Sequence, residues 1–146
     1  MGSRKVIMTI DTIFIKAIIE AGQAWSLASD NGWAVSESVD YEDAEVIPFW
    51  SSAAKAEAAA SDEWKGYKPE SIALAVLLEE WLPGMHYDVT LAGVNWGADR
   101  KGAESEPLAL AQEIISALKK SGKQLSFANH TDLSDYENEV KEALKG

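Results

Sequence analysis

Apolar residues recur at a spacing of three or four positions in five stretches of the chain, which is the pattern of amphipathic helices. The stretches are residues 10–21, 53–60, 74–82, 107–118 and 134–144. Gly22 follows the first stretch and Pro83-Gly84 follows the third, so we expect helices to end there. Residues 134–137 (Ser-Asp-Tyr-Glu) have the residue types of a capping box and predict the start of the last helix.

Alternating apolar residues predict a β-hairpin after the first helix. Trp25 and Leu27 alternate in its first strand, and Trp33 and Val35 alternate in its second. A two-residue turn would place the two pairs on opposite faces, whereas a three-residue loop over residues 30–32 would place all four side chains on one face. We predict the three-residue loop, because the other register exposes two large apolar residues.

Three further extended segments are expected. Residues 46–50 predict a short strand that either lies at a sheet edge or ends at Pro48, because Pro48 has no amide hydrogen to donate to a neighbouring strand. Residues 64–67 predict another short extended segment, and residues 87–96 predict the longest strand. In this last strand the apolar parity changes around Gly93, which indicates either a bulge or a strand that is covered on both faces.

These elements predict an α+β fold, with a mainly antiparallel sheet of four or five strands and helices packed chiefly on one face. The 146 residues have the length of one domain. We expect residues 1–8 to be a flexible N-terminus or a cloning remnant and residues 9–121 to form the single α+β domain. Residues 122–146 are expected to form a C-terminal extension with a short helix.

The charge of the chain narrows the classes of partner. With 24 acidic and 13 basic residues the net charge is −11, which repels phosphate backbones and disfavours nucleic-acid binding. The same charge fits a basic protein partner, and it also favours solubility. The chain has no cysteine and no membrane-spanning apolar run, and we expect no signal peptide. We therefore expect a cytoplasmic protein without membrane attachment, as a monomer or a small homo-oligomer.

Few residues offer catalytic chemistry. The two histidines, His86 and His130, have no partners at the spacing of a metal site, and no nucleophile elbow, phosphate loop or dinucleotide fingerprint is present. Acidic pairs such as Glu79 and Glu80 arise by chance among 24 acidic residues, and we expect both of these side chains to be solvated. We therefore predict no catalytic residue, no metal and no cofactor, and we lean against an enzyme.

Six tryptophans are the main anomaly of the composition. Such large rings usually pack in the core, and we place Trp25 and Trp33 there. Three others lie at the ends of predicted elements, where an indole can be half exposed and can form a platform for a sugar or a peptide. Asn95, beside one of them, adds hydrogen-bond donors and an acceptor. The predicted ligand- or partner-binding residues are therefore Trp50, Trp64, Asn95 and Trp96.

The order of the tryptophan motifs resembles a known bacterial family. The motifs are Trp25-Ser26-Leu27, Gly32-Trp33, Pro48-Phe49-Trp50-Ser51 with Ala56, Glu63-Trp64, Trp81-Leu82-Pro83-Gly84 and Gly93-Val94-Asn95-Trp96. Over about residues 10–118 the chain resembles the family called domain of unknown function 2750. The resemblance implies a small bacterial cytoplasmic domain, and it implies no activity.

Three classes of function stay open at this point. We favour a non-enzymatic binding or protein-interaction module, of an immunity or regulatory type, because the surface is acidic and no catalytic constellation is visible. The alternative is a small-ligand domain that binds a sugar or a peptide on a tryptophan platform. A hydrolase that uses Asp or Glu together with His86 is the weakest candidate.

Overall fold

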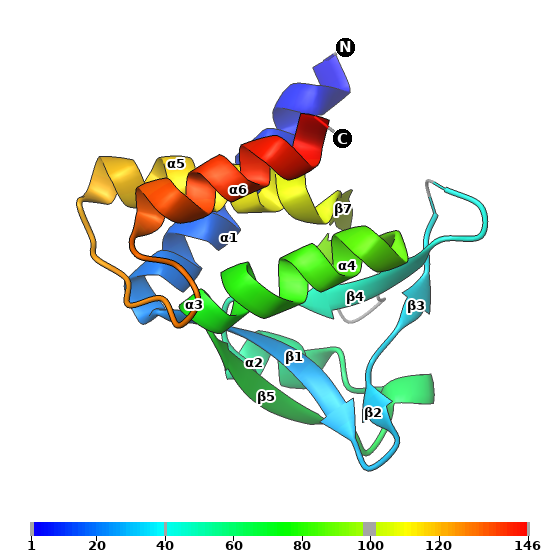
Figure 1. Ribbon diagram of the computed structural model, residues 1–146. Coiled ribbons are helices and arrows are strands. Elements are labelled where there is room, and N and C mark those ends of the chain that lie inside the picture. Colours follow the sequence, from blue (N-terminus) through cyan, green and yellow to red (C-terminus); the bar gives the residue numbers. More distant parts are fainter. Residues whose placement is uncertain (1, 40, 98–101, 146) are drawn as a thin grey trace.

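The computed structural model describes residues 2–39, 41–97 and 102–145, and of residues 2–11 only the backbone. Its strands form two sheets with helices around them (Figure 1). One sheet has the order β2-β1-β5, made of Gly32–Trp33, Gln23–Ser29 and Lys68–Ala73. The other has the order β3-β4-β6-β7, made of Ser36–Glu37, Glu45–Phe49, Thr90–Val94 and Ala103–Ser105.

The α+β class with mainly antiparallel pairing is confirmed. Among the described strand pairs, only β4 and β6 run parallel. The prediction of a single sheet of four or five strands is wrong. The strands form two sheets, and one isolated bridge connects β1 to the residue that follows β4. There Trp25 and Trp50 exchange two backbone hydrogen bonds, of 2.9 and 2.7 Å.

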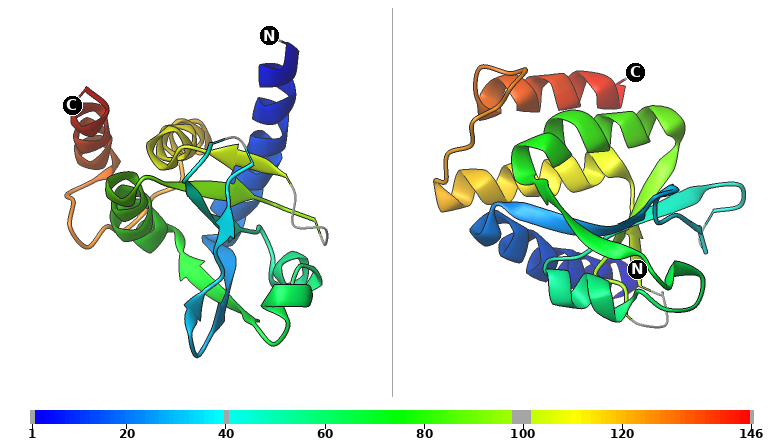
Figure 2. Two further views of the ribbon diagram at one scale, coloured as in Figure 1. Left: turned by 90° about the vertical axis from the view of Figure 1, so that its right-hand side faces the viewer. Right: turned by 90° about the horizontal axis from the view of Figure 1, so that it is seen from below.

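Helices cover the four-stranded sheet from both sides. On one side lie α1 (Gly2–Ala21), α5 (Pro107–Ser121) and α6 (Leu133–Lys145), together with the helix that runs over residues 74–88. On the other side lie α2 (Ala53–Ala58) and the 3₁₀ turn η1 (Asp62–Trp64) (Figure 2). Packing of the helices chiefly on one face is therefore not confirmed.

Two apolar cores meet at β4 and β6. Phe49 and Val94 face the larger core, which the helices α1, α5 and α6 fill. Val46 and Leu91, of opposite parity, face a smaller core that contains three tryptophans. All five residues of β6 are buried, so the parity change that we noticed around Gly93 reflects a strand covered on both faces.

The hairpin register that we predicted is wrong. Ser29 pairs with Gly32 and Ala28 with Trp33, so the connection has two residues and the apolar pairs lie on opposite faces. Trp33, 37% exposed, is not left without contact: its ring meets that of Trp81 edge-on, with the centroids 4.6 Å apart. The sequence analysis rejected this register because it would expose large apolar residues, but the helix over residues 74–88 covers part of Trp33.

That helix runs through Pro83 and Gly84, where we expected a stop. It consists of α3 (Leu74–Val76), a π-helical segment η2 (Leu77–Trp81) and α4 (Leu82–Asp88). Proline in a helix lacks the amide donor and crowds the preceding turn. In the wider π turn the amide of Leu82 donates to the carbonyl of Leu77, five residues back, and the helix continues to Asp88.

Several other boundaries differ from the prediction. Residues 64–67 are not extended, since η1 ends at Trp64, and the strand that follows is β5. The strand expected over residues 87–96 is limited to β6, because Tyr87 still belongs to α4 and Val89 ends that helix in the left-handed region. The last helix is capped at Asp132, whose side chain accepts from the amide of Asp135, two residues before the predicted cap.

Candidate functional site

The tryptophans that we predicted to be half exposed are buried. Trp50, Trp64 and Trp96 have exposed fractions of 0, 2 and 4%, so that expectation is wrong. Trp33, which we placed in the core, is more exposed than any of these three. Buried indoles offer no surface for a sugar or a peptide to stack on in this conformation.

The predicted binding residues form a structural cluster just beyond the ends of β4 and β6, where the ring of Trp64 from η1 meets that of Trp50. The indole of Trp50 donates to the carbonyl of Trp96 at 2.7 Å, and the indole of Trp96 donates to the carbonyl of Ala103 at 2.9 Å. Asn95 has a φ of +48°, and its side-chain oxygen accepts from the amide of Ser51 at 2.9 Å. A binding role for Trp50, Trp64, Asn95 and Trp96 stays a prediction, and it requires this cluster to open.

Two glycines allow the ring of Trp96 to lie flat against the backbone. A Cβ added to Gly93 would lie 2.7 Å from Cε2 of the indole, and one added to Gly102 would lie 2.6 Å from Cδ1. Ordinary carbon contacts are about 3.5–4.0 Å, so neither position has room for a side chain. The motif Gly93-Val94-Asn95-Trp96 therefore has a packing reason.

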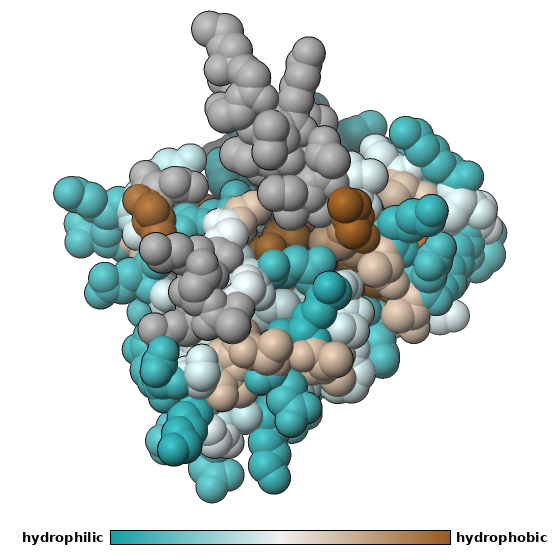
Figure 3. Space-filling model, turned by 180° about the vertical axis from the view of Figure 1, so that it is seen from behind, coloured by the Kyte–Doolittle hydropathy of each residue, from teal (hydrophilic) through white to brown (hydrophobic). Residues whose placement is uncertain are grey.

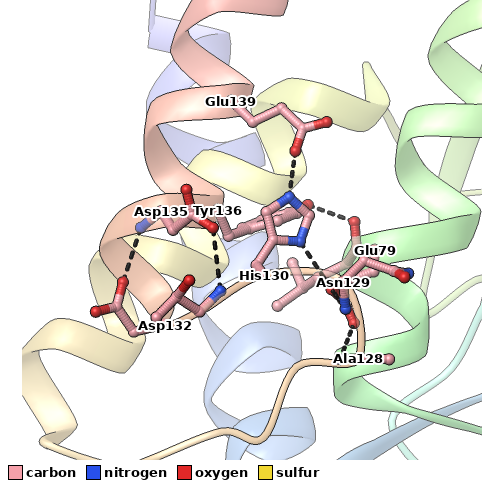
Figure 4. A network of polar contacts seen from close by, with 10 residues as sticks. Glu79, Ala128, Asn129, His130, Asp132, Asp135, Tyr136 and Glu139 are labelled. Atoms are coloured by element: carbon pink, nitrogen blue, oxygen red, sulfur yellow. Dashed lines mark hydrogen bonds and ion pairs between the residues drawn. The ribbon is translucent and has the colours of Figure 1, made fainter.

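A polar network joins the C-terminal extension to the helix over residues 74–88 (Figure 4). The carboxylate of Glu79 accepts from the amides of Ala128 and Asn129, each at 2.7 Å, and contacts Nδ1 of His130 at 2.7 Å. Nε2 of His130 contacts the carboxylate of Glu139 on α6. The side chain of Glu79 is only 3% exposed, so our expectation that it is solvated is wrong.

The network shifts the pKa values of its members. Burial by itself would lower the pKa of His130, but the hydrogen bonds and charges of Glu79 and Glu139 outweigh it and raise that pKa. Burial would raise the pKa of Glu79, but hydrogen bonds from His130 and two backbone amides lower it. Tyr136 has a strongly raised pKa, mainly because its phenol is buried. These directions favour a protonated imidazole between two carboxylates.

A pocket of about 440 Å³ lies beside this network. It brings together both histidines, which are 44 positions apart in the sequence, with Glu79 and Glu139. Both ring nitrogens of His130 already face carboxylates, so this imidazole has no free nitrogen with which to activate a nucleophile. No serine, threonine or lysine is among the described residues that line the pocket. The geometry therefore gives no support to nucleophilic catalysis by His130 there.

A second pocket, of about 590 Å³, is lined mainly by polar and acidic residues. It lies between the loop after β3 and the end of α4, and five exposed carboxylates line it. Tyr41 and Val89 also line it, and each of these two side chains is more than half exposed. We call this surface the acidic face; its carboxylates are those of Glu37, Glu42, Asp43, Glu45 and Asp88.

Other surfaces of the described residues are less distinctive. Seen from behind, the molecule is mainly hydrophilic, and apolar side chains form only small separate patches around the grey atoms (Figure 3). Within residues 2–39, 41–97 and 102–145, no three His, Asp or Glu side chains are placed to hold a metal ion. In the same part of the chain no helix combines the length and the apolar character needed to cross a membrane.

Residues 12–114 match the family described as "Protein of unknown function (DUF2750)". The chain belongs to this family. The match confirms the resemblance carried by the tryptophan motifs, and it ends before the C-terminal extension that supplies His130 and Tyr136. Comparison with curated proteins gave no match, and comparison with solved structures gave none either.

Sequence reasoning missed the His130 network, and it interprets residues 37–45, which carry five carboxylates and no basic residue, only as a solvated loop. Glu79, His130 and Glu139 come from η2, a loop and α6, and no spacing rule links such distant positions. One signal was available for the acidic face. The run from residue 37 to 45 is rich in carboxylates and also contains Val39 and Tyr41, which a purely solvated loop does not need.

Proposed function

We propose that this member of the DUF2750 family is a non-enzymatic interaction module that binds a basic protein partner through its acidic face. The observation that carries the proposal is that Tyr41 and Val89, both exposed, line the same pocket as the five carboxylates. Exposed apolar side chains that lie together with polar and charged ones are typical of protein-interaction surfaces.

Charge identifies the class of partner. The five carboxylates of the acidic face lie around one pocket, and the whole chain carries a net charge of −11. Such a field attracts basic surfaces over a distance and orients them before contact, while the apolar side chains supply contact area. The proposal keeps the cytoplasmic location and the monomer or small homo-oligomer expected from the sequence.

A comparison of three baits tests the proposal. The wild-type chain, an acidic-face variant and a control variant are immobilised and exposed at low salt to extract of the source organism. The acidic-face variant carries Glu42→Gln, Asp43→Asn and Glu45→Gln. The control carries Asp30→Asn, Glu57→Gln and Glu70→Gln, which removes the same three charges from exposed positions outside the acidic face.

The proposal expects a protein of basic isoelectric point that the wild type and the control retain and the acidic-face variant loses. The purified partner should also bind Tyr41→Ala at least about fivefold more weakly, because tyrosine is enriched among the interface hot spots whose truncation costs more than about 1 kcal/mol. Absence of any captured protein would contradict the proposal. An acidic partner, or equal loss from both charge variants, would contradict it too.

A further inference from the structure

The C-terminal extension contacts the family domain at η2, as well as at α5 and α1. Tyr136 of α6 is fully buried, and its hydroxyl donates to the carbonyl of Leu78 in η2. Pro83 is the fifth residue after Leu78 and has no amide hydrogen, so it cannot donate to that carbonyl in a π turn. The extension therefore supplies a donor that the helix itself lacks.

The second attachment depends on a proton. Glu79, one residue further along η2, binds the loop through the amides of Ala128 and Asn129 and through His130. A neutral imidazole has one donor and one acceptor nitrogen, whereas a protonated imidazole has two donors. Since a carboxylate faces each ring nitrogen of His130, only the protonated ring satisfies Glu79 and Glu139 together.

We propose that residues 122–146 form a pH-sensitive latch, closed over η2, α4 and α5 while His130 is protonated and opened more often once His130 loses its proton. Phe127 and Tyr136 pack on the imidazole, with ring centroids 6.1 and 5.1 Å away, so movement of His130 is coupled to movement of α6. Opening would remove the walls that His130, Glu139 and the rest of α6 give to the 440 Å³ pocket.

Other titratable groups lie around His130 and also affect how the latch responds to pH. From η2 it faces Glu79; from α6 it faces Glu139 and Tyr136; and His86 of α4 and Glu142 of α6 line the same pocket. The described residues of α5 that line the pocket contribute only Leu108, which is apolar.

Two attachments do not depend on the proton of His130. Lys119 of α5 pairs with Glu137 of α6 at 2.6 Å, and the ammonium of Lys123 donates to the carbonyl of Ile19 in α1. Loss of the His130 proton therefore increases the open fraction of the latch and does not detach the extension completely.

The sign of the pH dependence follows from the two shifted groups. The pKa of His130 is raised above its ordinary value of 6.5, so its contribution is complete below that pH and is lost as pH rises through the raised value. The pKa of Glu79 is lowered from 4.5, so its contribution is complete above that pH and is lost as pH falls through the lowered value. The latch is tightest between these limits.

Two measurements on the intact chain test the latch. The first is an NMR titration of the two histidine rings, with His86→Gln used to assign the signals. The second is hydrogen exchange at the amides of Ala128 and Asn129, expressed as protection factors from pH 5 to 9. The two measurements are thermodynamically linked. For each pH unit by which the titration midpoint of His130 exceeds about 6.5, the protection factors at high pH should be tenfold lower than those at low pH.

Two variants serve as controls. His130→Gln has no titrating ring, so its protection factors should not change with pH across this range. Glu139→Gln, at an exposed position, removes one carboxylate and leaves Glu79 in place, so the His130 midpoint and the pH of latch opening should fall together. The proposal is overturned by protection that is independent of pH in the wild type, by the same pH dependence in His130→Gln, or by a midpoint at or below about 6.5.

Discussion

Replacing Gly93 by alanine should destabilise the domain, because the added methyl group enters the ring of Trp96. The new Cβ would lie 2.7 Å from Cε2, 2.9 Å from Nε1 and 3.0 Å from Cζ2 of the indole. The ring cannot retreat freely, since its Nε1 donates to the carbonyl of Ala103 and Gly102 lies against it. Insertion of a methyl group into such a packed site costs about 1–3 kcal/mol.

The same substitution at Gly84 is a matched control, for which we expect a change in the free energy of unfolding of opposite sign. Gly84 lies within α4, and a Cβ built there meets no atom within 4 Å. Alanine in a helix is favoured over glycine by about 0.8–1 kcal/mol, so Gly84→Ala should stabilise. The two variants should therefore differ in free energy of unfolding by about 2–4 kcal/mol, the sum of the two effects.

Urea unfolding followed by tryptophan fluorescence and circular dichroism measures both variants. The cause is isolated by a third and fourth chain, Trp96→Leu with and without Gly93→Ala. If the indole is the obstacle, Gly93→Ala should cost less than about 0.5 kcal/mol when Trp96 is already leucine, because the coupling between contacting residues disappears. A full cost in the leucine background, or a wild-type midpoint for Gly93→Ala alone, would refute the packing argument.

Three further outcomes are expected from urea unfolding. Trp50→Ala should cost about 3–5 kcal/mol, the range for buried aromatic truncations, and Trp33→Ala about 1–2 kcal/mol because its ring is partly exposed; equal costs would contradict this order. Tyr136→Phe should cost about 1–3 kcal/mol, since a buried carbonyl loses its donor. The free energy of unfolding of the wild type should exceed that of His130→Gln by the largest amount between pH 4.5 and 6.5, the ordinary pKa values of Glu79 and His130.

Local patterns in the sequence predicted the elements whose surroundings are simple. The amphipathic pattern of residues 107–118 corresponds to α5, where Pro107 opens the helix and Gly122 ends it in the left-handed region. The α+β class followed from the alternation of such helices with short apolar strands. These predictions succeeded because a helix that buries one face has apolar residues every three or four positions, and this pattern is visible in a single sequence.

Predictions failed where distant segments changed the local balance. Trp33 lies on the face that we considered too exposed, because Trp81 covers part of it from 48 positions away. The helix continues through Pro83 because η2 adopts a π turn and Tyr136 donates to the carbonyl of Leu78. Local propensity cannot predict that Trp81 contacts Trp33 or that Tyr136 contacts Leu78, since these residues become neighbours only in the folded chain.

The placement of the tryptophans also changes where function should be sought. The motifs that relate the chain to its family contain Trp50, Asn95 and Trp96, and these residues bond to one another's backbone and neighbours inside the smaller core. Such contacts explain the motifs as requirements of the fold. We propose that a binding function is carried instead by residues outside them, on the acidic face, because none of its five carboxylates belongs to a tryptophan motif. The tryptophan motifs therefore account for the scaffold, and exposed side chains outside them, such as those of Glu42, Asp43 and Glu45, are where we propose that partners are distinguished.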